Sequence, residues 1–318
     1  MLLNVLLIIV GFALLIKGAD FLVSGSSKIA KKFHIPEIII GLTIVSIGTS
    51  MPELFVSITS AVEGYSDMAL GNVIGSNICN LLLILGLSSV IRPIKFQRET
   101  RIIELPLSLI LTIIFWIICF SNNFISKAEG IFLLVLFLGF ILYTIYMGLQ
   151  GDKSEKKSQE VLKEERGKFF IFKNVVYIII GIIALKYGGD FVVDNSVEIA
   201  ELFNISDAII SLTILAIGTS LPELVTSVTA AIKGNSDIAI GNIIGSNIFN
   251  MLMIIGVSAS IKPITYNPSY NIQMIILLIA IVFLALFPFI KPKNEMSRGN
   301  GIVYIITYIV YMALLFVI

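Results

Sequence analysis

Residues 41–80 read GLTIVSIGTSMPELFVSITSAVEGYSDMALGNVIGSNICN, and residues 211–250 repeat them as SLTILAIGTSLPELVTSVTAAIKGNSDIAIGNIIGSNIFN. The offset is 170 throughout, without a gap, and 27 of the 42 positions from Ile39 to Asn80 are identical in the second copy. Asp20-Phe21 recurs as Asp190-Phe191 at the same offset. Similarity of this extent indicates that the chain consists of two related halves.

The composition indicates that both halves lie in a membrane. Hydrophobic residues make up 57% of the chain and charged residues 14%, whereas a soluble domain has about 25% charged residues. Uncharged stretches such as 105–120 and 272–290 can cross a hydrocarbon layer about 30 Å thick as helices. The sequence therefore predicts an all-α integral membrane protein whose main partner is the lipid bilayer.

A charged segment separates the two halves. GDKSEKKSQEVLKEERGK, residues 151–168, has little to bury and is typical of an exposed linker. We expect a first repeat over 1–150 with its motif at 39–80, a linker over 151–173, and a second repeat over 174–318 with its motif at 209–250. The expected helices are ten, centred near residues 12, 50, 80, 112, 138, 184, 220, 250, 281 and 310.

The helix count and the basic residues together predict the topology. Five helices per half is an odd number, so the second half enters the membrane from the opposite side, as in the inverted repeats of many secondary transporters. One set of loops carries most of the Lys and Arg residues, including those of the linker, whereas the opposite set carries Lys127 and Lys262. The positive-inside rule then predicts extracellular termini and a cytoplasmic linker in the cell membrane.

The composition argues against several other functions. A net charge of +1 gives no electrostatic footprint for nucleic acid. His34 is the only histidine and follows two lysines, so histidine-based catalysis has almost no material. Cys79 and Cys119 stand alone in apolar segments, which is typical of small core residues and not of a zinc site. We expect no enzyme activity and no cofactor.

The glutamates of the two motifs are the main candidate site residues. Glu53 and Glu223 lie on polar stripes of otherwise apolar helices, and no buried Lys or Arg lies in either motif to pair with them. An ionised carboxylate in a membrane costs several kcal/mol unless a cation, a partner or water compensates it. A bound cation is the simplest compensation, and protonation is the alternative.

Proline next to each glutamate predicts a break in the helix. Pro52 and Pro222 have no N–H to donate to the carbonyls of Gly48 and Gly218, and each ring clashes with that carbonyl. In a membrane such a break is tolerated only where it is buried or lines a cavity. The freed carbonyls, the Thr and Ser hydroxyls and the carboxylates form an all-oxygen set, which hard cations prefer.

The next helix of each half carries a second polar stripe. Its members are spaced by four residues and are Asn72, Ser76 and Asn80 in the first half and Asn242, Ser246 and Asn250 in the second. The deeper members, at the level of the glutamates, are candidate ligands. Asn72 and Asn242 could equally join helices by hydrogen bonds.

With these motifs, the sequence resembles the Ca²⁺:cation antiporter superfamily and, within it, the prokaryotic sodium/calcium exchangers. GTSMPEL and GTSLPEL, with GNVIGSNICN and GNIIGSNIFN, correspond to the two alpha-repeats of that family. The resemblance implies four central ion sites that Ca²⁺ and Na⁺ occupy in alternation. It implies Glu53 and Glu223 as the Ca²⁺ carboxylates, with backbone oxygens from Thr49 and Thr219.

The resemblance also implies the remaining ligands. The Na⁺ ligands on one side are Ser50, Ser76 and the carbonyl of Ser46. Those on the other side are Ser220, Ser246 and the carbonyl of Ala216, and Asn80 and Asn250 complete the centre.

The implied function is secondary antiport of Na⁺ against Ca²⁺ by alternating access, carried out by a monomer. Exchange is electrogenic if three Na⁺ ions replace each Ca²⁺. Proton-coupled members of the superfamily usually carry GN where both motifs here have GT, and potassium-dependent members typically have aspartate where Asn250 stands. These features favour Na⁺ coupling without K⁺, and Ca²⁺/H⁺ antiport through the same glutamates is the alternative. A channel and an intramembrane enzyme are the more distant possibilities.

Overall fold

The computed structural model describes residues 1–33, 35–150, 168–203, 216–290 and 293–315. Within these ranges eight helices are long and apolar enough to cross a membrane, and a ninth span results if a bent helix pair over 37–62 is counted as one. The expected helix centred near residue 220 is described only from Ala216 onward, and most of the expected linker lies outside the described residues. Residues 168–173 of that linker form the first turns of a long helix.

In the first half α1 and α8 are long uninterrupted helices, and the segments between them are divided into shorter helical pieces. The elements of this half are α1 (Leu2–Phe33), α2 (Glu37–Ile40), η1 (Gly41–Val45), α3 (Ser46–Thr49), α4 (Met51–Glu63), α5 (Ser66–Ile78), η2 (Cys79–Ile84), α6 (Leu85–Ile91), β1 (Ile94–Lys95), η3 (Thr100–Glu104), α7 (Leu105–Asn122), β2 (Phe124–Ile125) and α8 (Lys127–Gln150).

The second half repeats this order among its described residues. Its elements are α9 (Lys168–Leu202), α11 (Ala216–Thr219), α12 (Leu221–Lys233), α13 (Ser236–Ile248), η6 (Phe249–Ile254), α14 (Ile255–Ile261), β3 (Ile264–Thr265), η7 (Pro268–Tyr270), α15 (Asn271–Leu286), η8 (Phe287–Phe289), β4 (Glu295–Met296) and α16 (Arg298–Leu315). From α4 to β1 each boundary recurs 170 residues later, from α12 to β3, so the sequence duplication is also a structural one.

Two short sheets join the halves. β1 pairs with β4 and β2 pairs with β3, both antiparallel. Each sheet therefore combines the strand after one half's central helix with the strand between the other half's last two helices. The exchange is reciprocal, which places the two halves face to face.

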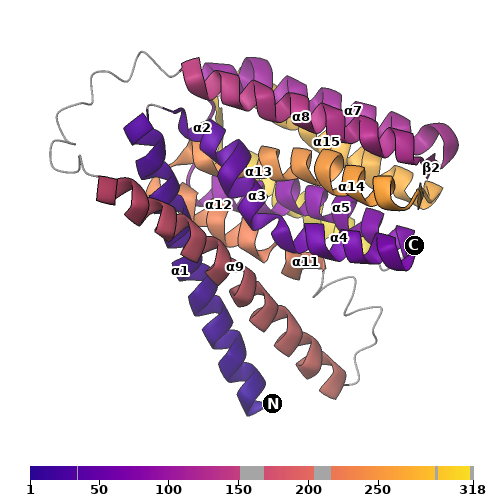
Figure 1. Ribbon diagram of the computed structural model, residues 1–318, viewed down its shortest axis with the longest axis horizontal. Helices are drawn as coiled ribbons and strands as arrows, with labels where there is room; N and C mark the ends of the chain where they lie inside the picture. Colours follow the sequence, from indigo (N-terminus) through magenta and orange to yellow (C-terminus); the bar gives the residue numbers. More distant parts are fainter. Residues whose placement is uncertain (34, 151–167, 204–215, 291–292, 316–318) are drawn as a thin grey trace.

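The helices α5 and α13, with the segments that continue them, form the centre of the molecule (Figure 1). In the 18-residue stretch of the α13–α14 span that is best suited to cross a membrane, 94% is buried inside the protein. The corresponding share is 22% in α8, in α9 and in α16. η2 and η6, which continue α5 and α13, are π-helical. Such wider turns are frequent at functional sites. The central helices are thus the ones that carry the second polar stripe of each half.

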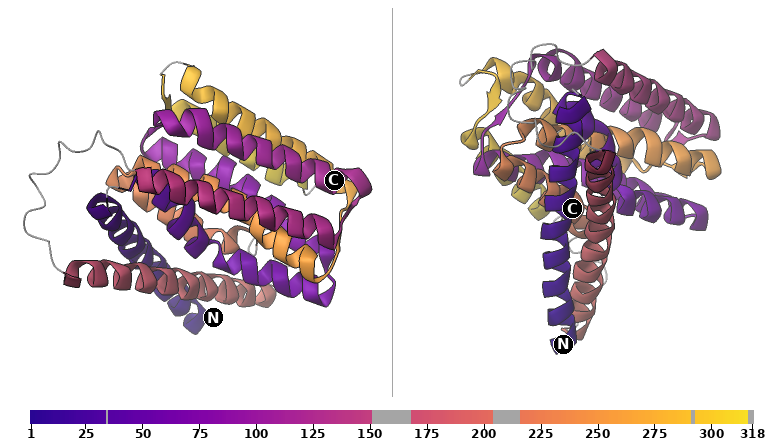
Figure 2. Two further views of the ribbon diagram at one scale, coloured as in Figure 1. Left: turned by 45° about the horizontal axis from the view of Figure 1, so that its top comes forward. Right: turned by 60° about the vertical axis from the view of Figure 1, so that its left-hand side comes forward.

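The helices α1 and α9 lie side by side and extend away from the rest of the bundle (Figures 1 and 2). Their contact is lined by glycines on both helices, and a Cβ at Gly18 would lie 2.9 Å from the carbonyl oxygen of Gly181. Gly11 and Gly188 meet in the same way at 2.8 Å. Small residues at this spacing let two membrane helices approach closely without interlocking side chains.

The glycine contact between α1 and α9 predicts the effect of adding one methyl group. Gly18→Ala should destabilise the protein by about 1–3 kcal/mol, because overpacking forces the two backbones apart. The measurement is thermal unfolding in detergent. Gly139→Ala is the matched control, since nothing lies within 4 Å of a Cβ at Gly139 in α8. An unfolding temperature for Gly18→Ala equal to that of Gly139→Ala contradicts the close contact.

Candidate ion-binding site

Each polar stripe with a glutamate is interrupted at one serine. Ser50 separates α3 from α4 with φ −84° and ψ 12°, and Ser220 separates α11 from α12 with φ −87° and ψ 5°. Pro52 and Pro222 stand in the first turn of the following helix, where a missing N–H is tolerated. In the first half the two segments are bent by 49°. The predicted proline-dependent break is therefore present in both halves.

The breaks leave Ser50 and Glu53 with the spacing of a capping box, S-x-x-E. Ser126 and Glu129 form such a box at the start of α8, where the Glu129 carboxylate accepts from the Ser126 N–H at 2.7 Å. Ser50 makes no side-chain cap on its own helix, and neither does Ser220. The hydroxyls that would cap these helices are directed elsewhere.

Both hydroxyls contact the glutamate of the other half. Ser50 Oγ donates to Glu223 Oε1 at 2.7 Å, and Ser220 Oγ donates to Glu53 Oε1 at 3.5 Å. Ser76 Oγ from α5 lies 3.3 Å from Glu53 Oε1 and 3.0 Å from Ser220 Oγ, so two hydroxyl hydrogens are shared among the contacts of Ser76, Ser220 and Glu53. Both carboxylates are at most 1% exposed. The predicted serines therefore converge with both glutamates in one buried centre built from both halves.

Several oxygens at this centre are buried without a hydrogen-bond partner. They are Glu53 Oε2, Glu223 Oε2, Asn80 Oδ1, Asn250 Oδ1 and Ser246 Oγ. Buried polar atoms are normally satisfied, so a group of unpartnered oxygens indicates a missing ligand. Because each of these atoms accepts a hydrogen bond or binds a cation, the set fits a hard cation.

The predicted threonines sit beside the breaks and join the halves. Thr49 Oγ1 lies 3.2 Å from the Ser46 carbonyl and 3.1 Å from Asn242 Oδ1. Thr219 Oγ1 lies 3.5 Å from Asn72 Oδ1. Because their hydroxyls are used in this way, any contribution of the threonines to an ion comes from the backbone.

The predicted carbonyl ligands lie one turn before the breaks. The Ser46 hydroxyl donates to Leu42 O at 2.9 Å within its own helix. Ser46 therefore offers the site its carbonyl, which already accepts from Thr49. Ala216 is the first residue of α11, and its side chain lies outside what the structure describes.

Asn72 and Asn242 make the helix-joining hydrogen bonds that the sequence left open. Asn72 Nδ2 donates to Ser57 Oγ at 3.0 Å and to the Glu53 carbonyl at 3.3 Å. Asn242 Nδ2 donates to Ser227 Oγ at 2.8 Å. With amide and oxygen both engaged, these residues hold the broken helix of each half against the central helices.

Asn77 and Asn247 are buried beside the site, although they lie off the polar stripes that the sequence singles out. Asn80 Nδ2 donates to Asn247 Oδ1 at 3.0 Å, and Asn250 Nδ2 donates to Asn77 Oδ1 at 3.0 Å. Both residues immediately follow a stripe serine and so lie beside the stripe. Their presence in both copies of the GSNI segment was the available signal.

A cavity of about 380 Å³ leads from the surface to the second break. Its lining includes Phe55 from α4, the charged residues Lys186, Asp190 and Asp194 from α9, and Pro222 at the break. Pro222 directly precedes Glu223 in the chain, while the buried Glu223 carboxylate itself is not part of the lining. The cavity lies on the side where α9 faces α4.

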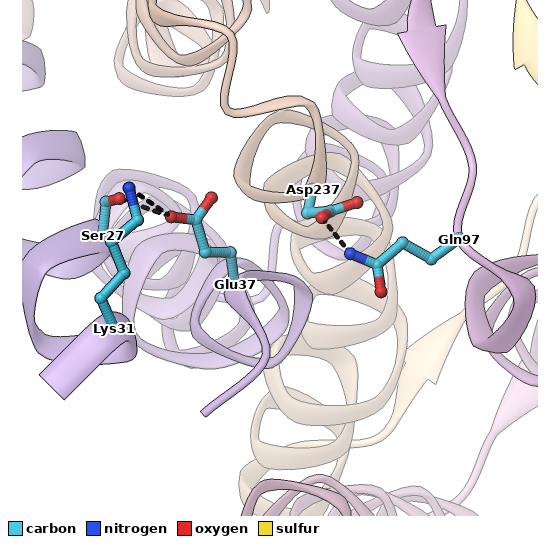
Figure 3. Close-up of polar contacts among 5 residues, drawn as sticks. All are labelled: Ser27, Lys31, Glu37, Gln97 and Asp237. Atoms are coloured by element: carbon cyan, nitrogen blue, oxygen red, sulfur yellow. Dashed lines mark hydrogen bonds and ion pairs between the residues drawn. The ribbon is translucent and has the colours of Figure 1, made fainter. Parts of the chain in front are cut away.

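The acidic residues at the helix starts are held by neighbouring side chains (Figure 3). Glu37 of α2 accepts from Ser27 at 2.5 Å and pairs with Lys31 at 3.7 Å, while Asp237 of α13 accepts from Gln97 at 2.5 Å. Carboxylates in a first helical turn are also favoured by the helix dipole. Among the described residues no group of three or more His, Cys, Asp or Glu side chains could hold a metal. The paired glutamates remain the anionic centre.

Comparisons with known proteins agree with this geometry. The family model described as "Sodium/calcium exchanger protein" matches residues 3–146 and 173–317. The chain belongs to the sodium/calcium exchanger protein family. It is 36% identical to the inner membrane protein YrbG of Escherichia coli, with 99% of this chain and 98% of YrbG covered. It is 32% identical to the sodium/calcium exchanger MaX1 of Methanosarcina acetivorans, covering 98% of each chain.

A solved structure of the sodium-calcium exchanger NCX_Mj, soaked with Na⁺ and Ca²⁺, superposes on the chain with a TM-score of 0.86. The two are 32% identical, and 98% of each chain is covered. The protein is therefore a multi-pass membrane antiporter of cations and not an enzyme, and the family uses no cofactor. The sequence-based family assignment is confirmed.

Because two carboxylates are buried together, we expect that removing one of the charges stabilises the cation-free protein. In Na⁺-free, Ca²⁺-free buffer at alkaline pH, Glu53→Gln should raise the unfolding temperature, because it removes one uncompensated buried charge. Thermal unfolding with and without Ca²⁺ measures this, and the variant should lose the stabilisation that Ca²⁺ gives the parent. Glu129→Gln, in the half-buried capping box of α8, should match the parent, because Gln also serves in a capping box. A lower unfolding temperature for Glu53→Gln without cations contradicts the interpretation.

Proposed function

We propose that the protein exchanges Na⁺ for Ca²⁺ across the cell membrane by alternating access. The observation that carries this proposal is the pair of buried glutamates, each with an unpartnered Oε2, bridged by serines of the opposite half. Two carboxylates neutralise one Ca²⁺ completely, which offsets the cost of burying both charges in the protein.

The proposed Ca²⁺ ligands are the carboxylates of Glu53 and Glu223 with backbone oxygens of Thr49 and Thr219. Na⁺ ions take the weaker oxygen sites on either side. These are built from Ser50, Ser76 and the Ser46 carbonyl in one direction, from Ser220, Ser246 and the Ala216 carbonyl in the other, and from Asn80 and Asn250 at the centre.

Competition of Na⁺ and Ca²⁺ for one site couples the gradients of the two ions. Ca²⁺ and several Na⁺ ions compete for the same carboxylates, so either load compensates the buried charge and the empty site does not. A load of three Na⁺ carries one more charge than Ca²⁺, which makes the exchange electrogenic. Inward Na⁺ flow then drives Ca²⁺ out of the cell.

The proposed topology is ten membrane helices in two inverted repeats, 1–150 and 174–318. The reciprocal strand pairing and the recurring element boundaries support it. The distribution of Lys and Arg supports extracellular termini and a cytoplasmic linker over 151–173. Because both halves of the site lie within one chain, a monomer suffices for function.

Ca²⁺/H⁺ antiport is the second candidate, because two buried carboxylates can also carry protons. Thr49 and Thr219 in the GTS segments favour Na⁺, and the neutral Asn250 argues against a K⁺ requirement.

The coupling ion is tested in proteoliposomes that contain the purified protein. With equal pH on both sides, an outward Na⁺ gradient should drive ⁴⁵Ca²⁺ uptake, and an inside-positive potential should accelerate it. Adding K⁺ to either side should have no effect beyond the potential it sets. Uptake that ignores Na⁺ and follows a pH gradient instead overturns the Na⁺ assignment and supports the proton alternative.

The site assignment is tested by removing one charge at a time. Glu53→Gln and Glu223→Gln should each reduce Na⁺-driven ⁴⁵Ca²⁺ uptake by at least about 100-fold, since a single remaining carboxylate cannot neutralise Ca²⁺ and a lost charge–ion contact costs roughly 3–5 kcal/mol. Glu129→Gln is the control and should transport normally. Size-exclusion chromatography checks that all three are folded. Near-normal uptake by either site variant removes the assignment.

A further inference from the structure

Asn77 and Asn247 lie where the central helices α5 and α13 cross, and both are at most 2% exposed. Asn77 Nδ2 donates to the backbone carbonyl of Asn247 at 3.3 Å, and Asn247 Nδ2 donates to the backbone carbonyl of Asn77 at 3.3 Å. The two residues are equivalent in the 170-residue repeat. An axis that relates the two halves therefore passes between them.

These contacts fix the orientation of both amide groups. A backbone carbonyl can only accept, so each asparagine must present its nitrogen to the carbonyl and its oxygen to the other side. Asn77 Oδ1 is thereby available as an acceptor on one side, and Asn247 Oδ1 on the other. A flipped amide would place two acceptors in contact in a buried environment, which is costly.

The orientation of the Asn77 and Asn247 amides determines that of Asn250 and Asn80. Asn250 Nδ2 donates to Asn77 Oδ1 at 3.0 Å, and its other hydrogen reaches Ser76 Oγ at 3.4 Å. Asn80 Nδ2 donates to Asn247 Oδ1 at 3.0 Å. With their nitrogens engaged, Asn80 and Asn250 are left with Oδ1 atoms that are buried and unpartnered.

We propose that Asn77 and Asn247 are positioning residues that make Asn250 and Asn80 present oxygen, not nitrogen, to the transported cation. Asn77 acts on Asn250 and Asn247 acts on Asn80, so the control is crossed between the halves. We assign neither residue as a ligand, because its Oδ1 accepts from the neighbouring amide and is not among the unpartnered oxygens of the centre. This inference rests on the proposed cation-exchange function.

The test removes the acceptor while keeping the side-chain volume. Asn77→Leu leaves Asn250 free to turn its nitrogen toward the cation, and Ca²⁺ binding measured by calorimetry should weaken about tenfold, the worth of roughly one hydrogen bond to a charged group. The maximal ⁴⁵Ca²⁺ uptake rate at saturating Ca²⁺ should stay within about twofold, because the carboxylates that neutralise the ion are unchanged. Asn174→Leu replaces another buried asparagine, whose amide donates to a carbonyl of its own helix, and should leave Ca²⁺ affinity unchanged.

A double-mutant cycle separates positioning from a general packing defect. In an Asn250→Ala background, Asn77→Leu should have no further effect on Ca²⁺ affinity, whereas in an Asn80→Ala background the loss of about tenfold should persist. Asn247→Leu should show the opposite dependence. Equal weakening in both backgrounds, or a fall in maximal rate with unchanged affinity, overturns the inference.

If Asn77→Leu does not fold, Asn77→Ala and the Asn247→Leu cycle give the same comparison. Parent protein that binds no Ca²⁺ overturns the proposed function together with this inference. Parent protein that binds Ca²⁺ normally while the cycles show no selective coupling overturns the inference alone.

Discussion

Two carboxylates that share a buried centre without a basic partner set the main constraint on this structure. Glu53 and Glu223 are both buried, and the ion pairs among the described residues, Lys31–Glu37, Lys186–Asp190 and Lys233–Asp20, all involve other acids. Holding two negative charges in a membrane interior costs several kcal/mol, which hydroxyl donors offset only in part. The helix breaks, the crossed serines and the unpartnered oxygens all follow from the need to bring oxygen and a mobile cation to this point. Neither half can meet that need alone, since Ser50 serves Glu223 and Ser220 serves Glu53.

The same two-fold relation governs the contacts around the site. Asn77 meets Asn247, its own equivalent, and the α1–α9 contact pairs Gly11 with Gly188 and Gly18 with Gly181, which are exchanged by the 170-residue offset. The central contact is made by directional hydrogen bonds, which fix one register. The peripheral contact is made by glycine backbones, which allow close approach without interlocking. The two contacts therefore share one two-fold relation but differ in kind, directional hydrogen bonds at the centre and close backbone packing at the periphery.

Much of the site could be predicted from the sequence because its determinants are local. Pro52 and Pro222 set the breaks, and an acid without a basic neighbour in an apolar segment indicates a cation. The destination of the Ser50 hydroxyl could not be predicted, because the spacing Ser50–Glu53 is the same as in the capping box Ser126–Glu129 and only the tertiary arrangement distinguishes them. Asn77 was missed for a similar reason, since its partner is 170 residues away. The start of α9 at Lys168 differs from the expected boundary because a helix can extend past the apolar segment that spans the membrane.

The centre of the molecule is symmetric, but the contact of α1 with α12 differs in charge from the equivalent region of α9 and α4. Lys233 at the end of α12 pairs with Asp20 at 2.5 Å and donates to Ser24 at 2.6 Å, which ties α1 to α12. The equivalent positions in the other half are Glu63, Asp190 and Asp194, which are all acidic. The cavity beside the second break lies on this side, and its lining includes Asp190, Asp194 and Lys186, which pairs with Asp190 at 3.5 Å. The lysine that ties α12 to α1 thus has no basic counterpart on α4, and the cavity lies on the side where this tie is absent.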